Sequence, residues 1–212
     1  MKILLTGFET FGDNPINASQ RLVEALPNTL NENIHLQKLI LPVDEKLAPE
    51  IVLQAINEGK PNGVMAFGLA AGRTDISIER VAINLMDFQI PDNTGASISN
   101  EAVVSNGPEA YFSTLPVRKM LNKLTNARIP ASLSLSAGAF LCNQVFYSIM
   151  HEIDINKWGI PAGFIHLPTL PEGAAKNKKP IPSMSLDLML EAAKIMITCL
   201  YEEITLLNNE PK

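Results

Sequence analysis

The sequence is poor in the residues from which metal centres and disulfide frameworks are built. Its 212 residues include two cysteines, Cys142 and Cys199, and three histidines that lie far apart in the chain. Two cysteines fit reduced thiols better than a disulfide framework. No group of cysteines and histidines has the spacing of a zinc site. We therefore expect no metal and no other cofactor.

Positive charge and long apolar runs are also scarce. The net charge is −5, and the one basic run, residues 176–179, is followed by Pro180 and is typical of a solvated turn. Nucleic acid is therefore disfavoured as a partner. Residues 1–7 are too short for a signal-peptide core, and no later run reaches the length of a membrane span. We expect a cytoplasmic protein that does not contact a membrane.

The pattern of apolar residues predicts a single α/β domain over residues 1–212. The hydrophobic fraction is 46%, within the globular range, and the chain is long enough to bury a core. The predicted strands cover residues 2–6, 34–42, 63–68, 76–85, 131–135 and 163–167. The predicted helices cover residues 17–26, 44–58 and 115–127, a segment that begins near Cys142, and a last segment that begins near Ser183 or Ser185. This alternation indicates a mostly parallel sheet with helices on both faces.

Several candidate functional residues follow the predicted strands. In parallel sheets the ligand site lies beyond the carboxyl ends of the strands, so residues at these positions are expected to converge. They are Phe8, Phe11, Gly68, Gly138, Cys142 and His166. A long polar stretch over residues 89–106 separates two predicted elements, and a loop of that length is usually functional or disordered.

Cys142 is the candidate nucleophile. Small residues and a glycine precede it in the run 136–144, and an apolar helical pattern begins there. Unpaired backbone N–H groups and the helix dipole at a helix start favour a thiolate, which is the reactive form of cysteine. The alternative is that Cys142 is a small buried core residue, because it lies close to the apolar stripe of the helix.

A base and an orienting acid are needed to complete such a site. His166, at the end of a predicted strand, could accept the thiol proton, although a hydrogen-bonded structural histidine is the alternative. Glu79 interrupts an apolar strand, where a carboxylate is costly unless it is paired. It could orient the imidazole, or it could form an ion pair with Arg73 or Arg80.

Six short motifs in this order and spacing resemble those of the pyroglutamyl peptidase I family of cysteine peptidases. They lie at residues 7–12, 17–19, 78–84, 90–93, 136–143 and 164–168. Several motifs along one chain are more specific than any single one. The resemblance implies a phosphorylase/hydrolase-like fold, a three-layer α/β sandwich with a mixed, mostly parallel sheet. It also implies a cytoplasmic homotetramer without metal that removes N-terminal pyroglutamyl residues from peptides.

The resemblance further implies a catalytic triad of Glu79, Cys142 and His166. The thiolate would attack the pyroglutamyl carbonyl, and the imidazole would protonate the leaving amine, with the carboxylate orienting the imidazole. Backbone N–H groups at the helix start could hold the oxyanion.

The resemblance also implies a pocket for the pyroglutamyl ring. Phe8, Phe11 and Phe140 match family positions that wall it, with ordinary core packing as the alternative. We also place Asn17 and Gln89 among the substrate-binding residues. The ring is small and neutral, so its pocket should be mostly apolar with a few polar partners.

Gln89 departs from the family pattern, because an arginine is usual at this position. A glutamine amide donates hydrogen bonds but carries no charge, so the second hypothesis is a weakly active or non-catalytic homologue that binds pyroglutamyl peptides. A third is a different enzyme on the same fold, such as a nucleoside phosphorylase, because fold alone does not specify function.

Overall fold

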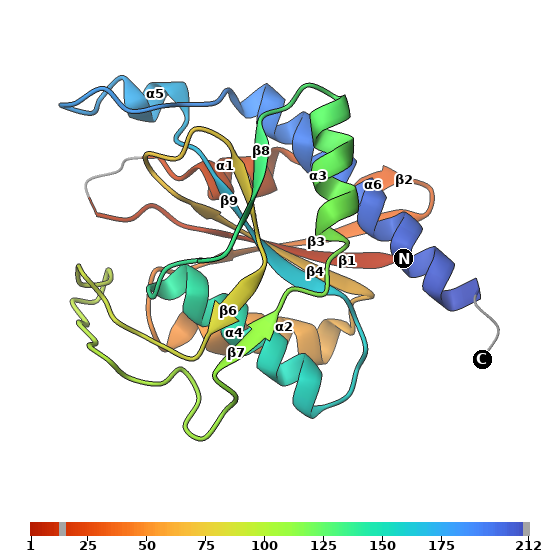
Figure 1. Ribbon diagram of the computed structural model, residues 1–212, viewed down its shortest axis with the longest axis horizontal. Helices are drawn as coiled ribbons and strands as arrows, with labels where there is room; N and C mark the ends of the chain where they lie inside the picture. The colour runs from red at the N-terminus through yellow and green to blue at the C-terminus, as the bar shows by residue number, and fades with distance from the viewer. Residues whose placement is uncertain (13–15, 210–212) are drawn as a thin grey trace.

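The computed structural model describes residues 1–12 and 16–209 (Figure 1). Nine strands and six helices are assigned in this part of the chain. In chain order they are β1 (Lys2–Phe8), α1 (Ala18–Ala25), β2 (Thr29–Asn31), β3 (Ile34–Leu41), α2 (Leu47–Gly59), β4 (Gly63–Leu69), β5 (Ile76–Glu79), β6 (Val81–Ile83), β7 (Ala110–Phe112), α3 (Val117–Asn126), β8 (Ala131–Ser134), α4 (Leu141–Ile155), β9 (Ala162–Leu167), α5 (Pro171–Ala174) and α6 (Leu186–Asn209).

A seven-stranded mixed sheet forms the middle layer, in the order β2-β3-β1-β4-β9-β5-β8. The pairs β3–β1, β1–β4, β4–β9 and β5–β8 are parallel, and β2–β3 and β5–β9 are antiparallel. Helices α2 and α4 cover one face, and α1, α3 and α6 cover the other (Figure 1). The structure thus confirms the predicted α/β fold with a mostly parallel sheet between two helical layers.

Alternating side chains of the central strands divide the core in two. On β1, Ile3 and Leu5 pack with α1, α3 and α6, whereas Leu4 and Phe8 pack with α2 and α4. Successive side chains of a strand point to opposite faces, and a strand covered on both faces is apolar throughout. This explains why β1, β4 and β9 are read so clearly from the sequence.

Helix boundaries follow local chemistry. Asn17 caps α1, because its side chain accepts a hydrogen bond from the backbone N–H of Ser19. Lys60, in the left-handed conformation, ends α2. Ser185 accepts a hydrogen bond from the N–H of Leu188 and so caps α6, one of the two serines that the sequence offered for this role. None of the described helices is both long and apolar enough to cross a membrane.

The strand predicted over residues 76–85 is wrong in one respect, because it is two strands in different sheets. β5 belongs to the central sheet, whereas β6 pairs with β7 in a separate two-stranded sheet. The change of partner occurs at Arg80, whose N–H donates to Ser134 O and whose carbonyl accepts from Ser113 N. The short elements β2, β7 and α5 are too brief to leave a periodic pattern and are not predicted.

The route of the chain to Cys142 also differs from the expectation. β8 is parallel to β5, and β5 is antiparallel to β9, so β8 runs opposite to β1, β4 and β9. The carboxyl end of β8 therefore does not lie at the same edge as theirs. Residues 135–140 lead the chain back to that edge, where α4 begins (Figure 1).

The polar stretch 89–106 is a long irregular loop fixed by hydrogen bonds. Asp92 Oδ1 accepts from the N–H groups of Thr94 and Ala96, and its Oδ2 accepts from the N–H of Glu45, at 2.9 Å each. Burial opposes ionisation of Asp92, but the hydrogen bond from the Thr94 hydroxyl and these backbone hydrogen bonds lower its pKa below the usual value. The loop is thereby attached to the segment that precedes α2.

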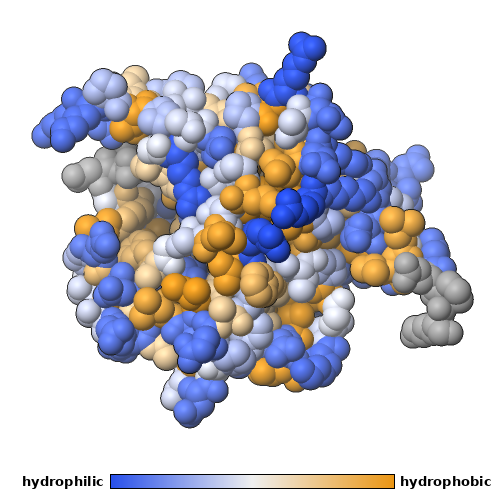
Figure 2. Space-filling model, in the orientation of Figure 1, coloured by the Kyte–Doolittle hydropathy of each residue, from blue (hydrophilic) through white to orange (hydrophobic). Residues whose placement is uncertain are grey.

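The surface mixes apolar and polar side chains. Figure 2 shows them interspersed over the face seen there. Phe112 and Leu135 are among the large apolar side chains that are exposed. Single exposed apolar residues are ordinary in folded proteins, so we assign them no function.

Candidate active site

The acid and the base predicted from the sequence are in contact. Glu79, the last residue of β5, and His166, in β9, are joined by a hydrogen bond of 2.7 Å between Oε1 and Nδ1. The carboxylate is fully buried and the histidine is 4% exposed. A carboxylate on Nδ1 leaves Nε2 as the ring nitrogen that can exchange a proton with another group. The pair therefore has the arrangement of an oriented general base.

Cys142, the second residue of α4, lies beside the strand that carries the histidine. Gly68 of β4 is paired in register with His166 of β9. A Cβ atom placed on Gly68 would lie 2.9 Å from Cys142 Sγ, so the sulfur fills the space that a side chain would occupy. The fold thus brings Cys142 to the same end of β4 and β9 as the Glu79–His166 pair.

The surroundings of Cys142 act against the thiolate that its place at a helix start favours. Burial raises its pKa to about 12, the charge of Glu79 adds to the rise, and Arg73 opposes it. Burial also lowers the pKa of His166, against the opposing effect of Glu79. Both shifts favour a neutral thiol and a neutral imidazole in the free site.

The start of α4 offers backbone donors beside the sulfur. Phe140 precedes the helix in an extended conformation, and within the described residues no side chain caps the helix. The N–H of Gln144 makes the first helical hydrogen bond, to Phe140 O. The N–H groups of the first helical turn have no partner within a helix, and here they can stabilise an oxyanion formed next to Cys142.

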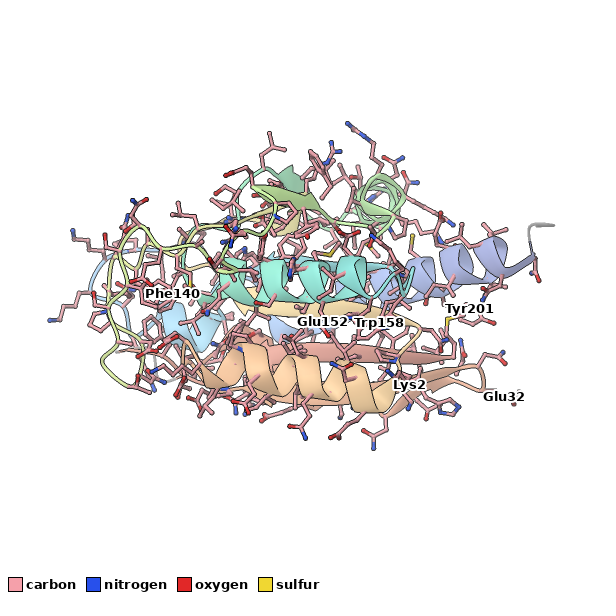
Figure 3. The ribbon with its side chains drawn as sticks, turned by 90° about the horizontal axis from the view of Figure 1, so that it is seen from below. Lys2, Glu32, Phe140, Glu152, Trp158 and Tyr201 are labelled. Atoms are coloured by element: carbon pink, nitrogen blue, oxygen red, sulfur yellow. The ribbon has the colours of Figure 1, made fainter. Side chains whose placement is uncertain are left out.

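Cys142 lines an apolar pocket of about 260 Å³. Its lining residues are Phe8, Phe11, Asn17, Val43, Leu69, Ala71, Ile90, Phe140, Leu141 and Cys142. Apart from the thiol, the lining contributed by the described residues has one polar side chain, the amide of Asn17. In Figure 3, Phe140 lies at the start of α4, at the end of the molecule opposite Trp158.

The aromatic wall of the pocket is continuous. Phe140 packs against Phe11, with ring centroids 5.2 Å apart, and edge-on against Phe88 at 4.6 Å. Four residues that the sequence assigned to substrate binding, Phe8, Phe11, Asn17 and Phe140, line this pocket. Gln89 does not. Its side chain is exposed, between the buried Phe88 and the rim residue Ile90.

Two polar residues of the site were given no functional role from the sequence. Arg73 forms an ion pair with Glu79, with Nη1 2.7 Å from Oε1. Glu79 therefore contacts the imidazole and also forms an ion pair, so the two alternatives for this carboxylate hold together. Asn143 is fully buried and joins α4 to β6 through hydrogen bonds with the backbone of Ile83 and Leu85. The clue for Asn143 was its position directly after the cysteine.

The remaining cysteine and histidines lie elsewhere. Cys199 is fully buried in α6, His151 contacts the hydroxyl of Tyr111 at 2.9 Å, and His35 lies in β3. Over residues 1–12 and 16–209, no three metal-ligating side chains group together.

Comparisons with known proteins agree on one family. The family described as "Pyroglutamyl peptidase" matches residues 1–203. The pyrrolidone-carboxylate peptidase of Vibrio vulnificus (strain YJ016) is 43% identical over 203 residues, which cover 95% of this chain and 94% of that protein. The enzyme of the same name from Pyrococcus furiosus is 41% identical over 208 residues, which cover 96% and 100%.

Solved structures give the same result. The crystal structure of pyrrolidone carboxyl peptidase from Pyrococcus furiosus superposes with a TM-score of 0.93 at 40% identity, covering 96% of this chain and all of that one. A second structure, titled Pf-PCP(1-204)-C, has a TM-score of 0.94 at 39% identity and full coverage of both chains. None of these comparisons supports the non-catalytic alternative. The chain belongs to the pyroglutamyl peptidase family and is a peptidase of that family.

Proposed function

We propose that this chain is a cysteine omega peptidase that hydrolyses the bond after an N-terminal pyroglutamyl residue, with Cys142 as nucleophile, His166 as base and acid, and Glu79 as orienting acid. The observation that carries the proposal is the position of Cys142. Its sulfur borders an apolar pocket and lies against Gly68, the strand residue paired with a histidine that a buried carboxylate orients. The names of the similar proteins, pyrrolidone-carboxylate peptidase, support the substrate class.

The reaction begins with a proton transfer. His166 Nε2 takes the proton of the Cys142 thiol as Sγ attacks the pyroglutamyl carbonyl carbon, and the imidazolium is stabilised by Glu79. N–H groups at the start of α4 stabilise the oxyanion. When the C–N bond breaks, the imidazolium protonates the leaving amine, which leaves a thioester. Water, deprotonated by His166, then hydrolyses the thioester and releases pyroglutamate.

The pocket suits a neutral ring. Pyroglutamate has no ammonium group, so its recognition needs no carboxylate or metal, and the lining formed by the described residues has neither acidic nor basic side chains. We propose that Phe8, Phe11 and Phe140 pack on the lactam ring. Asn17 is the polar partner. Its Oδ1 is engaged by Ser19 and one N–H by Glu9 O, so with respect to the described residues one amide N–H is left for the lactam carbonyl.

We propose a substrate-binding role at the rim for Gln89. Its backbone position next to Ile90 puts it beside the pocket, and its exposed amide could donate a hydrogen bond to the peptide. Because it is uncharged, it would stabilise developing negative charge less than an arginine would. We therefore expect a lower kcat than an arginine at this position would give.

We also propose that residues 1–212 form one catalytic domain and that the protein works in the cytoplasm as a homotetramer. A central seven-stranded sheet, with strands from β1 through β9 of the chain, supports the first statement. Two free thiols suit a reducing compartment. Sedimentation equilibrium tests the assembly, and a monomer at micromolar concentration would refute it.

The direct test uses pyroglutamyl-7-amino-4-methylcoumarin. We expect the wild type to release the fluorophore, Cys142→Ser to lose activity by about 10³-fold or more, and iodoacetamide to abolish it. Cys199→Ser is the matched control, because it removes a thiol from α6, far from the pocket, and should keep the activity. Equal rates for the wild type and Cys142→Ser would refute the assignment of the nucleophile. A wild type that is alkylated at Cys142 but cleaves no pyroglutamyl substrate would refute the substrate class.

A further inference from the structure

Arg73 joins the two halves of the candidate active site. Its Nη1 donates to Glu79 Oε1 at 2.7 Å, and its Nη2 donates to Ser136 O at 3.1 Å. Ser136 belongs to the segment 135–140 that leads into the helix of Cys142. The guanidinium thus fixes the orienting acid to the segment that delivers the nucleophile. A planar guanidinium makes both bonds in a defined geometry, which a lysine cannot reproduce.

The carboxylate of Glu79 has an unequal distribution of partners. Oε1 accepts from both Arg73 and His166, whereas Oε2 is buried and has no partner among the described residues. Burial of a lone carboxylate is costly, and the guanidinium keeps its charge at any pH at which the protein works. Arg73 therefore balances the charge of Glu79 even when His166 is neutral.

This charge balance decides how many protons the site holds. With Arg73 present, the positive charge of the guanidinium balances the negative charge of Glu79 while the imidazole stays neutral. Without Arg73, a buried negative charge would remain, and the site would take up a proton more readily, whether on the imidazole or on the carboxylate. A proton on the imidazole would prevent His166 from accepting the thiol proton. A proton on the carboxylate would remove the anion that stabilises the imidazolium. The positive charge of Arg73 also acts, after burial, to lower the pKa of His166.

We propose that Arg73 is a positioning residue that keeps Glu79 and His166 in the form that accepts a proton and holds Ser136, and with it the nucleophile segment, in place. This inference rests on the proposed function for its reaction, but the charge balance can be measured without peptidase activity. Arg73 does not line the pocket, so its effect should pass through Glu79 and Ser136 and leave substrate affinity nearly unchanged.

The test compares three variants by their pH profiles of kcat/KM for pyroglutamyl-7-amino-4-methylcoumarin. In Arg73→Gln, we expect the acidic limb to move to higher pH by about one unit or more and the plateau to fall, mainly in kcat. In Arg73→Lys, which keeps the charge, the limb should stay near that of the wild type, while the plateau falls by about tenfold because Ser136 is no longer held. Arg80→Gln is the matched control, since it removes the same charge from the next residue after Glu79. No side-chain hydrogen bond or ion pair of Arg80 is found across the described ranges.

A second measurement separates this proposal from the substrate assignment. The ring resonances of His166, assigned by their loss in His166→Gln, should titrate at higher pH in Arg73→Gln than in the wild type. If the wild type cleaves no pyroglutamyl substrate but this shift is seen, the proposed function fails and the role of Arg73 stands. An unchanged acidic limb and unchanged His166 titration in folded Arg73→Gln would overturn the role. If Arg73→Gln does not fold, Arg73→Lys still tests the role. A shift of its acidic limb of kcat/KM by a full pH unit would overturn the proposed role of the Arg73 charge.

Discussion

Gly68→Ala tests the placement of the nucleophile with the smallest possible change. The new Cβ would lie 2.9 Å from Cys142 Sγ and 2.8 Å from Cζ of Phe164. Nonbonded heavy atoms are comfortable at about 3.5–4.0 Å, so the sulfur and the ring must both retreat, by roughly 0.6–1.2 Å. The backbone itself accepts alanine, because Gly68 is an ordinary strand residue without a positive φ angle.

Both routes of relief disturb the chemistry. If the sulfur moves, it leaves its position against Gly68 of β4. If Phe164 moves, it pushes on His166, whose ring centroid lies 4.9 Å from that of Phe164. A misplacement of about 1 Å at a reacting centre can reduce the rate by about 10²-fold, which corresponds to about 2.7 kcal/mol of barrier. We expect kcat/KM to fall by this factor, and the overpacking to destabilise the fold by about 1–3 kcal/mol.

The matched control is Gly63→Ala, the same substitution at the other end of β4. There the new Cβ would meet the side chains of Leu200 and Ile204 at 3.1 and 3.2 Å, so it also overpacks the core but does so away from the site. Fluorogenic assays and urea unfolding of both variants separate the two effects. Gly63→Ala should lose stability and keep its kcat. A Gly68→Ala enzyme with wild-type kcat/KM and wild-type alkylation rate would refute the placement of Cys142.

Three further predictions follow from the site. Asn143→Ala should lower the free energy of unfolding by about 3 kcal/mol, because it leaves backbone groups of Ile83 and Leu85 without their hydrogen bonds; urea unfolding measures this, and a loss below about 0.5 kcal/mol contradicts it. Alkylation of Cys142 by iodoacetamide should accelerate about tenfold per pH unit through the alkaline range, because a pKa near 12 leaves little thiolate at neutral pH; a rate that is already constant above pH 7 would argue for a resting thiolate. Gln89→Arg should raise kcat by adding a cation at the pocket rim, and steady-state kinetics showing a large fall would indicate that the amide has a role of its own.

The sequence predicts the fold well where strands are apolar on both faces. β1, β4 and β9 are short apolar runs that end near glycine or proline, and such runs are recognisable without any tertiary knowledge. The split of the predicted strand at Arg80 was not predictable, because it depends on which strands offer partners, Ser134 on one side and Ser113 on the other. Register and strand direction are long-range properties, and no local pattern encodes them.

The same limit applies to the site. Cys142, His166 and Glu79 were candidates because of their positions at a helix start, at a strand end and in an apolar strand, and the resemblance to the pyroglutamyl peptidases joined them into a triad. Arg73 was considered only as a competitor for Glu79, since no one-dimensional pattern shows that one oxygen can accept both partners. The pKa shift of Cys142 was also inaccessible, because burial and the charges of Glu79 and Arg73 act on the thiol from parts of the chain that are distant in sequence.

Specificity and reactivity are coupled in this site because Cys142 borders two different environments. The apolar pocket that suits a neutral lactam is also part of the packing that raises the pKa of the thiol. A resting thiol is a weak nucleophile, so the enzyme gains reactivity only when His166 removes the proton during attack. A ligand that brings a positive charge into the pocket would lose its hydration without gaining an anionic partner. An unmodified N-terminal peptide with a free ammonium should therefore bind weakly at neutral pH.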